Sequence, residues 1–374
     1  MKKLAIIHFS PIELFPPTMN WLFFLDGAAG EDTRIRVFTM RPGDVSRKLM
    51  PESGKIRIIR PVRAGAKGWK AWSNYVMYYI QTIIGLLLWR PDTVLYYETL
   101  SSLPALLYKR YLNRKAGLYI HYHEYTSPAE YEQGMRMSRT LHKLERNSYK
   151  LADWISHTNA QRIRLFRSDM GDTGLPDLYE LPNYPPISWE PTGQRNLSAG
   201  PIKVVYVGAL SLETMYIAEF AEWVTAQHGK VTWDIYSDNI SDETRAYLLS
   251  LGVSTIRFRE AVDYQALPQV LAAYDIGVIL YKGHIPNYVY NAPNKLFEYL
   301  ACGLDVWFPN VMEGIDPFVT SGTYPKVLSL DFTSLASLDL SAATARSGMS
   351  HRPSAYYAEK VLPGLLEQMR TIKH

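Results

Sequence analysis

The sequence contains a single cysteine, Cys302, among its 374 residues, and this excludes a disulfide-stabilised scaffold. It also lacks low-complexity tracts, and 47% of its residues are hydrophobic, a fraction typical of packed globular protein rather than of intrinsic disorder. The apolar run after Met1-Lys2-Lys3 is short and has no small-residue cleavage site, which argues against a signal peptide. We therefore expect a cytoplasmic protein.

Several signature motifs are absent as well. No Gly-x-Gly-x-x-Gly follows the first apolar run and no Gly-x4-Gly-Lys-Ser/Thr occurs, which removes support for a dinucleotide-dependent oxidoreductase and for a P-loop nucleotidase. Gly-x-Ser-x-Gly and Asp-x-Asp are also missing, and the only close histidine pair is His121 and His123. These absences predict chemistry without a cofactor and without a metal ion.

The formal net charge of +4 is unevenly distributed along the chain. Residues 1–190 contain 26 Lys+Arg and 18 Asp+Glu, whereas residues 191–374 contain 14 and 18. The first half is therefore basic and the second half is acidic. This asymmetry predicts different partners for the two halves.

A chain of 374 residues is expected to form two domains, because single hydrophobic cores stop growing at about 250–300 residues. In the first half, short apolar runs alternate with segments long enough for crossover helices, a pattern typical of a doubly wound parallel sheet. The expected strands are 4–9, 34–40, 55–59, 93–97, 118–121 and 154–158.

A Pro- and Gly-rich segment at 181–201 predicts a linker or hinge. The alternation then restarts, with strands expected at 203–207, 231–236, 255–258 and 276–280, a helix through Trp223, and further helices near 243–250 and 264–273. The expected fold class is α/β, with two Rossmann-like doubly wound domains that face a cleft and bind ligands at their strand ends. The predicted domains are 1–185 and 186–352, followed by a helical segment, 353–374, that crosses back to the first domain and is interrupted at Pro363-Gly364.

The most informative segment runs from Tyr290 to Phe308. Pro293 suits the start of a helix, and Gly303 suits its end before a strand. Lys295 and Glu298 are spaced i,i+3 and share one helix face. Free N–H groups and the dipole at such an N-terminus favour a phosphate, and a carboxylate one turn later can accept hydrogen bonds from a ribose diol. An exposed ion pair is the alternative interpretation of these two residues.

The stretch Pro293-Asn-Lys-Leu-Phe-Glu-Tyr-Leu-Ala-Cys-Gly303 resembles the donor-site signature of GT-B fold glycosyltransferases, especially family 4. In that family a Pro-x-Lys-x-x-Glu-Tyr-x-Ala-x-Gly segment binds a nucleotide-sugar. The resemblance implies an acceptor-binding first domain and a donor-binding second domain. Weaker resemblances occur in the same order as in the family, at 118–124, 144–156, 181–183, 204–210, 256–262 and 274–280.

The resemblance also implies roles on the donor side. Lys295 would hold the diphosphate, Glu298 would hold the ribose, and Gly208 would let the backbone after a strand approach the phosphates. A simple cap of that strand is the alternative interpretation of Gly208. The remaining donor-binding candidates are Arg259, Lys282, Tyr290, Asn291 and Asn294.

The sequence departs from the family pattern at two places. Retaining members have a glutamate where this chain has Tyr290, and Ser211-Leu-Glu-Thr214 replaces the usual arginine and lysine after the glycine turn. These departures leave open the donor identity and the choice between retention and inversion.

The acceptor-side candidates follow expected strands. His123 and Glu124 come after the strand 118–121 and are expected to project into the cleft, where one of them would act as the catalytic base or position the sugar. His8 and Ser10 end the first strand and are expected to line the acceptor side. A core or capping histidine is the alternative interpretation of His123.

Basic and aromatic residues surround an apolar stretch at 80–89 in the first half. That stretch is too short to span a bilayer, which needs about 20 apolar residues. It suits a helix that covers the sheet, or one that lies on an anionic membrane surface. The cations form two groups: Arg47, Lys48, Lys55, Arg57, Arg60, Arg63, Lys67 and Lys70, and then Arg136, Arg139, Lys143, Arg146 and Lys150.

These observations predict a hexosyltransferase-type glycosyltransferase that moves a sugar from a nucleoside-diphosphate sugar to a glycan or lipid-linked acceptor in cell-surface polysaccharide synthesis. The expected partners are these substrates and an anionic membrane surface, with no nucleic acid, and the protein would be cytoplasmic or peripheral at the inner face of the cytoplasmic membrane. Two alternatives stay open: a nucleotide-sugar 2-epimerase on the same fold, and a catalytically silent glycan- or nucleotide-binding partner of a transferase.

Overall fold

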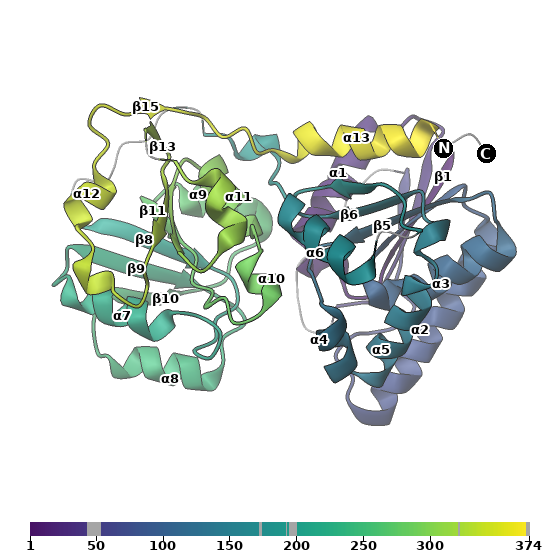
Figure 1. The fold of residues 1–374 in the computed structure, drawn as a ribbon, viewed down its shortest axis with the longest axis horizontal. Coiled ribbons are helices and arrows are strands. Elements are labelled where there is room, and N and C mark those ends of the chain that lie inside the picture. The colour runs from purple at the N-terminus through teal and green to yellow at the C-terminus, as the bar shows by residue number, and fades with distance from the viewer. Residues whose placement is uncertain (43–53, 172–173, 192, 194–199, 321, 372–374) are drawn as a thin grey trace. The chain divides into compact units, whose positions relative to one another are not determined.

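The computed structural model divides the chain into two units, Met1–Asn183 with Ala358–His374, and Tyr184–Tyr357. It describes residues 1–42, 54–171, 174–191, 193, 200–320 and 322–371. Each unit is built on a parallel sheet with helices on both faces (Figure 1). This confirms the predicted α/β class with two Rossmann-like domains.

Among the described residues, seven strands form the sheet of the first unit, in the order β3-β2-β1-β4-β5-β6-β7. All neighbouring pairs are parallel, and the order reverses at β1, as in a doubly wound sheet. The apolar runs that predicted these strands are buried on both faces because helices cover both. The strands are β1 (Lys3–His8), β2 (Arg34–Thr39), β3 (Ile56–Ile59), β4 (Thr93–Tyr97), β5 (Gly117–Tyr122), β6 (Trp154–His157) and β7 (Leu178–Glu180).

The helices of the first unit divide between the two faces of its sheet. Buried side chains of α2, α3, α5 and α6 join one hydrophobic cluster, and those of α1 and α13 join another on the opposite face. The helices are α1 (Pro16–Ala28), α2 (Gly68–Trp89), α3 (Ser102–Leu107), α4 (Pro128–Gln133), α5 (Arg136–Arg146), α6 (Ala160–Met170) and α13 (Ala358–Thr371), with short turns η1 (Ile12–Leu14), η2 (Thr99–Ser101), η3 (Tyr108–Leu112) and η4 (Tyr149–Leu151).

The second unit repeats this arrangement around a six-stranded sheet in the order β10-β9-β8-β11-β12-β14. Its pairs are parallel, and the order reverses at β8. The strands are β8 (Ile202–Val207), β9 (Val231–Tyr236), β10 (Ile256–Arg259), β11 (Ile276–Val278), β12 (Asp305–Pro309) and β14 (Val327–Leu330), and a separate pair joins β13 (Thr323–Tyr324) to β15 (Ser350–His351).

The helices of the second unit are mostly short. The helix predicted near 264–273 is divided into η6 and α9, because Pro268 opens a new helix after the first turn. The helix predicted near 243–250 is confirmed as α8. The helices are α7 (Ile217–Ala226), α8 (Asp242–Ser250), α9 (Leu267–Leu271), α10 (Pro286–Val289), α11 (Asn294–Ala301) and α12 (Leu340–Thr344), with η5 (Ile187–Trp189), η6 (Tyr264–Ala266), η7 (Glu313–Phe318) and η8 (Leu335–Ser337).

The predicted interruption of the last helix at Pro363-Gly364 is wrong, because α13 continues through both residues. Both are exposed, so the missing N–H group and the missing side chain fall on the solvent side of the helix. The opposite side buries Leu362, Leu365 and Leu366 in the cluster shared with α1. This packing stabilises a continuous helix where the local sequence favours a break.

Leu365→Ala should destabilise the first unit by about 2–5 kcal/mol, the usual cost of truncating a buried leucine. Leu365 is 1% exposed, whereas Gln368 on the same helix is exposed and serves as the control. Urea unfolding of both alanine variants measures the difference. Equal midpoints would contradict the packing of α13 on α1.

Candidate functional site

The carboxyl edge of the second sheet gathers several of the predicted donor residues. β8 and β11 are neighbours at the point where the strand order reverses, and ligands of open α/β sheets bind at such points. Gly208 directly follows β8, and α11, which begins with Asn294 and Lys295, lies between β11 and β12 in the chain. The N-terminus of a helix that connects two parallel strands lies at their carboxyl edge.

The ammonium group of Lys295 lies among tyrosines. Its Nζ is 5.3 Å from the ring centre of Tyr206 and 5.6 Å from that of Tyr281, and it donates a hydrogen bond of 3.4 Å to the Tyr281 hydroxyl. Burial lowers the pKa of Lys295, but Tyr206, Tyr281 and Glu298 outweigh burial and raise this pKa above its ordinary value. Lys295 is therefore a positive charge at neutral pH.

Two glycines let α11 and Lys295 approach the sheet this closely. Gly208 has a φ of +127°, and a Cβ there would lie 3.0 Å from Cε and Nζ of Lys295. At Gly277 in β11, a Cβ would lie 2.1 Å from the ring of Tyr299. The Tyr299 ring therefore rests directly on the strand, and its hydroxyl accepts the Val207 N–H at 3.2 Å.

Glu298 lies one turn after Lys295 and is 7% exposed, so the exposed ion pair considered from the sequence does not occur. Burial raises the pKa of Glu298 to about 7, although Lys295 and Tyr264 both favour the ionised form. A ligand that donates hydrogen bonds to this carboxyl group would favour the ionised form further.

Arg259 is paired with a buried acid. Its Nε donates to Asp234 Oδ2 at 2.8 Å, and Arg257 Nε donates to Oδ1 at 2.6 Å. The Tyr274 hydroxyl donates to the same Oδ2 at 2.7 Å. Because Asp234 is only 2% exposed, these donors compensate the burial of its charge. β10 lies two strands away from β8, so the structure assigns Arg259 to Asp234 and does not bring it to Lys295.

Lys282 contacts α7. Its Nζ lies 3.6 Å from the carboxylate of Glu219 and donates to the Leu212 carbonyl at 3.2 Å. Lys282 directly follows Tyr281, and consecutive side chains of an extended segment point to opposite sides. The structure therefore places Lys282 with Glu219 rather than with Lys295.

Tyr290 and Asn291 lie on the segment that leads into α11, and Asn294 is the first residue of that helix. Gly314 packs against this segment so closely that a Cβ would lie 2.5 Å from backbone atoms of Tyr290 and Asn291. The segment is thus seated against η7 at the start of the helix that carries Lys295. Tyr206 and Tyr281, which surround the ammonium, were not identified from the sequence.

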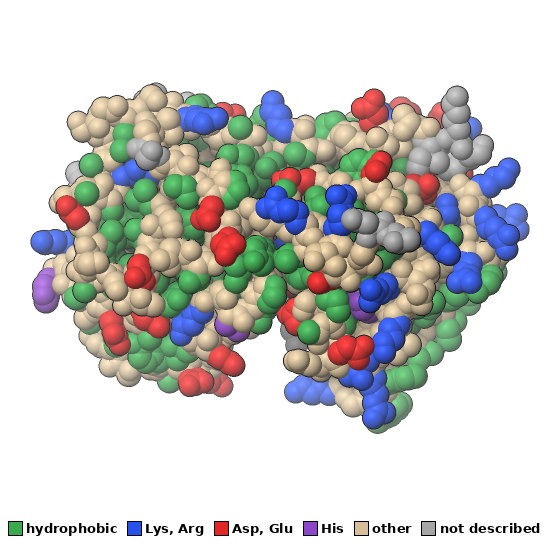
Figure 2. Space-filling view, viewed as in Figure 1, with side chains coloured by type: hydrophobic (Ala, Val, Ile, Leu, Met, Phe, Trp, Pro, Cys, Tyr) green, Lys and Arg blue, Asp and Glu red, His purple; other side chains and the backbone are tan. Residues whose placement is uncertain are grey.

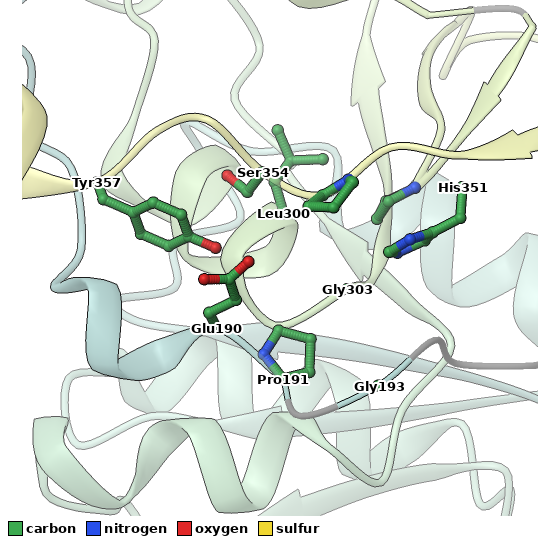
Figure 3. Close-up of a pocket in the computed structure, with 10 residues that line it drawn as sticks. Glu190, Pro191, Gly193, Leu300, Gly303, His351, Ser354 and Tyr357 are labelled. Carbon is green, nitrogen blue, oxygen red and sulfur yellow. The ribbon is translucent and has the colours of Figure 1, made fainter.

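A cavity of about 230 Å³ lies at the other end of α11 (Figure 3). Leu300 and Gly303 line it, with Glu190 and Tyr357 on one side and His351 on the other. Residues 295 and 303 are separated by roughly 12 Å along a helix of 1.5 Å rise per residue. The cavity is therefore separate from the predicted donor site.

In the first unit, His123 is buried with both ring nitrogens engaged. Nδ1 lies 3.2 Å from Asn183 Oδ1 and Nε2 lies 3.0 Å from Thr18 Oγ1. Since the amide oxygen only accepts, Nδ1 carries the proton and Nε2 accepts from the threonine hydroxyl. Burial, followed by His121 and His8, lowers the pKa of His123 well below its ordinary value. The structure thus places His123 in the interior at the carboxyl edge of the sheet, while Glu124 beside it is exposed.

Glu98 is a candidate that the sequence analysis missed. It directly follows β4 with a φ of +61°, and its Oε1 accepts the N–H groups of His123 at 2.6 Å and of Glu124 at 3.3 Å. Burial, and then the neighbouring Glu124, raises the pKa of Glu98 to about 8. Its position directly after the apolar run 93–97 was the sequence feature that could have indicated it. Strained backbone at a non-glycine residue clusters at functional sites.

His8 and Ser10 lie at the end of β1, on the same edge of the first sheet. His8 Nδ1 donates to the Ser10 carbonyl at 2.8 Å, and its ring centre is 4.3 Å from that of Phe15 and 6.2 Å from that of His123. Burial lowers the pKa of His8 to about 4. The structure therefore brings His8, Ser10 and His123 together.

No protein-family model matches the sequence, and no curated protein matches it.

Solved structures are similar to the chain over its full length. Sucrose-phosphate synthase from Thermosynechococcus elongatus has a TM-score of 0.73 at 15% identity, covering 100% of this chain and 99% of that chain. HepE of Anabaena, in complex with UDP and glucose, has a TM-score of 0.67 at 14% identity, covering 99% and 100%. A protein of Listeria monocytogenes designated a UDP-N-acetylglucosamine 2-epimerase has a TM-score of 0.59 at 13% identity, covering 99% and 96%. The chain therefore has the GT-B fold.

Acidification should destabilise the first unit. Burial is the largest cause that lowers the pKa of its interior histidines, so each contributes stability that is present above pH 6.5 and lost as the pH falls towards its folded value. Burial acts in the opposite direction on four acids: it raises the pKa of Glu98 to about 8 and that of Glu145 to about 7, and it also raises the pKa values of Asp169 and Glu180. The histidines are His8 and His142, with pKa values lowered to about 4, His121 and His157, lowered to about 3, and His123.

The five histidines outnumber these four acids, so the melting temperature should fall between pH 7 and pH 5, with each unbalanced histidine contributing at most about 1.4 kcal/mol per pH unit. Differential scanning fluorimetry across this range measures the trend. A melting temperature that stays constant or rises on acidification would contradict the burial of neutral histidines.

Proposed function

We propose that the protein is a glycosyltransferase that moves a sugar from a nucleoside-diphosphate sugar to a glycan or lipid-linked acceptor, without a metal ion. The observation that supports this most strongly is the position of Lys295 at the N-terminus of α11, beside Gly208 at the reversal point of a GT-B donor sheet. HepE, which shares this fold, is described in complex with UDP and glucose.

On the donor side, Lys295 and the first N–H groups of α11 would bind the diphosphate. Negative charge on the diphosphate increases as the nucleoside diphosphate leaves the sugar. The ammonium stabilises this charge and so favours cleavage of the bond between the sugar and the diphosphate. Glu298 would accept hydrogen bonds from the ribose hydroxyls. Its pKa of about 7 means that nucleotide binding near neutral pH would release a proton, since hydroxyl donors favour the carboxylate form.

On the acceptor side, Glu124 is the exposed carboxylate at the edge that also holds His8, Ser10 and His123. Glu124 would take the proton from the attacking hydroxyl. His123 would act through position: its ring is stacked on Tyr97 at a centroid distance of 4.9 Å, and its backbone N–H is fixed by Glu98. We further propose that the acceptor is presented at a membrane in cell-surface polysaccharide synthesis.

A nucleotide-sugar 2-epimerase is a second candidate, because the Listeria protein shares the fold. A silent glycan- or nucleotide-binding partner of a transferase is a third, because Tyr290 and Ser211-Leu-Glu-Thr214 depart from the donor-site pattern of the family. An epimerase would change the sugar of the free donor without acceptor, and a silent partner would bind nucleotide without turnover.

Lys295→Met should weaken the binding of a nucleoside diphosphate at least about tenfold, because a charge-assisted contact is worth about 1.5–3 kcal/mol. Isothermal titration with UDP, GDP, ADP and CDP identifies the nucleotide and measures the loss. Lys203→Met is the matched control, since Lys203 is exposed at the opposite, amino end of β8. Equal affinities in both variants would contradict the donor site.

Glu124→Gln should lower kcat by about 10²–10⁴, the usual contribution of a general base, and should leave nucleotide affinity unchanged. The assay measures release of the nucleoside diphosphate from the donor selected by titration, with a panel of glycan and lipid-linked acceptors. Unchanged turnover in this variant would exclude Glu124 as the base. Epimerisation of the sugar of the donor in the absence of acceptor would identify an epimerase instead.

A further inference from the structure

Helix α2 in the first unit exposes an uncharged apolar face. No Asp, Glu, Lys or Arg occurs from Ala71 to Trp89, although α2 lies on the surface of the unit. Trp69 is 84% exposed, Trp72 68%, Ile80 48% and Leu88 78%. A surface helix of a globular protein normally carries charged residues on its outer side, so the outer side of α2 requires an explanation of its own.

The outer face of α2 does not contribute to the core. The inner side of the helix is formed by Tyr78, Tyr79, Thr82 and Leu86, which are buried against the sheet. The outer stripe consists of Trp69, Trp72, Val76, Ile80, Ile84 and Leu87, whose spacing of three or four residues places them on one side of a helix. The packing of α2 on the sheet therefore depends on the inner side of the helix alone.

A groove of about 660 Å³ continues this face between α2 and α5. Trp72, Tyr75 and Tyr79 of α2 form one wall, and Met137 and Leu141 of α5 form the other. The groove is lined mainly by apolar and aromatic side chains. Its polar lining comes from α5, through Arg136 and Thr140.

Cations surround the apolar face. On α5, Arg136, Lys143 and Arg146 are exposed, and the acid Glu132 pairs with both Arg139 and Lys143. Figure 2 shows Lys and Arg side chains beside hydrophobic ones at the lower right, where α2 and α5 lie in Figure 1. Further cations lie near both ends of α2. Near its C-terminal end, beside the exposed Tyr111 and Leu112 of η3, they are Lys109, Arg110, Arg114 and Lys115, and at its N-terminal end they are Lys67 and Lys70. Arg47 and Lys48 of the predicted basic group lie outside the described residues.

We propose that the outer face of α2 and the cations of α5 form a docking surface for an anionic lipid bilayer. The apolar stripe would lie among the acyl chains near the headgroups, Trp69 and Trp72 would anchor the interface, and the α2–α5 groove would take one chain. The basic side chains would lie at the phosphate level, where each adds attraction to an anionic surface. Among the described residues, no helix has the length and apolar composition to cross a membrane.

A second copy of the chain fits this face less well. In a two-fold contact the same patch meets itself, so the cations of both α5 helices would come together. The acids of the neighbouring α4, the half-buried Glu130 and the exposed Glu132, are fewer than these cations, and Glu130 already caps α4 through Ser127. Charge complementarity therefore favours an anionic lipid surface.

Vesicle flotation tests the proposal without any nucleotide-sugar, so its outcome is independent of the proposed function. The full chain is mixed with vesicles of phosphatidylcholine alone or with about one third phosphatidylglycerol, at roughly 0.1 M and roughly 0.5 M salt. The expected result is flotation with the anionic vesicles, reduced by high salt. Trp69→Ala/Trp72→Ala and Arg136→Glu/Lys143→Glu should each lower the partition coefficient at least about tenfold.

Matched controls lie on the opposite face of the same sheet. Phe23→Ala on α1 and Lys360→Glu on α13 remove an exposed aromatic side chain and an exposed cation there, and both should float as the unaltered chain does. The melting temperature of every variant confirms folding, because all the substituted side chains are at least partly exposed.

Three results would overturn the proposal. They are no flotation with anionic vesicles at low salt, equal flotation of the face variants and the controls, and a dimer in sedimentation that Trp69→Ala/Trp72→Ala dissociates. The last result would identify the face as an interface between copies.

Discussion

Parallel pairing of the strands is the constraint on which the rest of both units depends. Parallel neighbours cannot be joined by a hairpin, so their connections cross the faces of the sheet, and the helices in these connections cover both faces. Helices that connect parallel strands begin at the carboxyl edge, where the residues that follow each strand also lie. Gly208 and Lys295 meet there in the second unit, and His8 and His123 meet there in the first. The residues of each pair are far apart in sequence, so the topology of the sheet brings them together.

The strands were predictable because burial on both faces demands apolar runs. The segments 93–97 and 231–236 coincide with β4 and β9, and most other strands differ by one or two residues. The C-terminal helix was less predictable, because Pro363-Gly364 is a helix-breaking pair in isolation. Only the packing of neighbouring leucines against α1 shows that both residues face solvent. Local sequence does not report which side of a helix a tertiary contact will bury.

The candidate site was predictable where residues share one helix and less so where they come from different strands. Lys295 and Glu298 are neighbours on α11 by spacing alone. Tyr206 reaches Lys295 from β8, and this contact depends on the packing of α11 on the sheet. Arg259 carries a charge that suits phosphate, but its neutralising partner Asp234 is on the adjacent strand. Pairs across strands depend on register, which a single sequence does not display.

The contact of Tyr299 with Gly277 has a consequence for how the second unit would recognise a ligand. Because the ring fills the space of the missing side chain and its hydroxyl is bonded to the backbone of β8, α11 has little freedom to slide or rotate on the sheet. The charge of Lys295 is therefore preorganised during folding, and ligand binding need not order the helix. Discrimination between nucleosides would then follow from the fixed shape of this edge rather than from adaptation of the helix to each ligand.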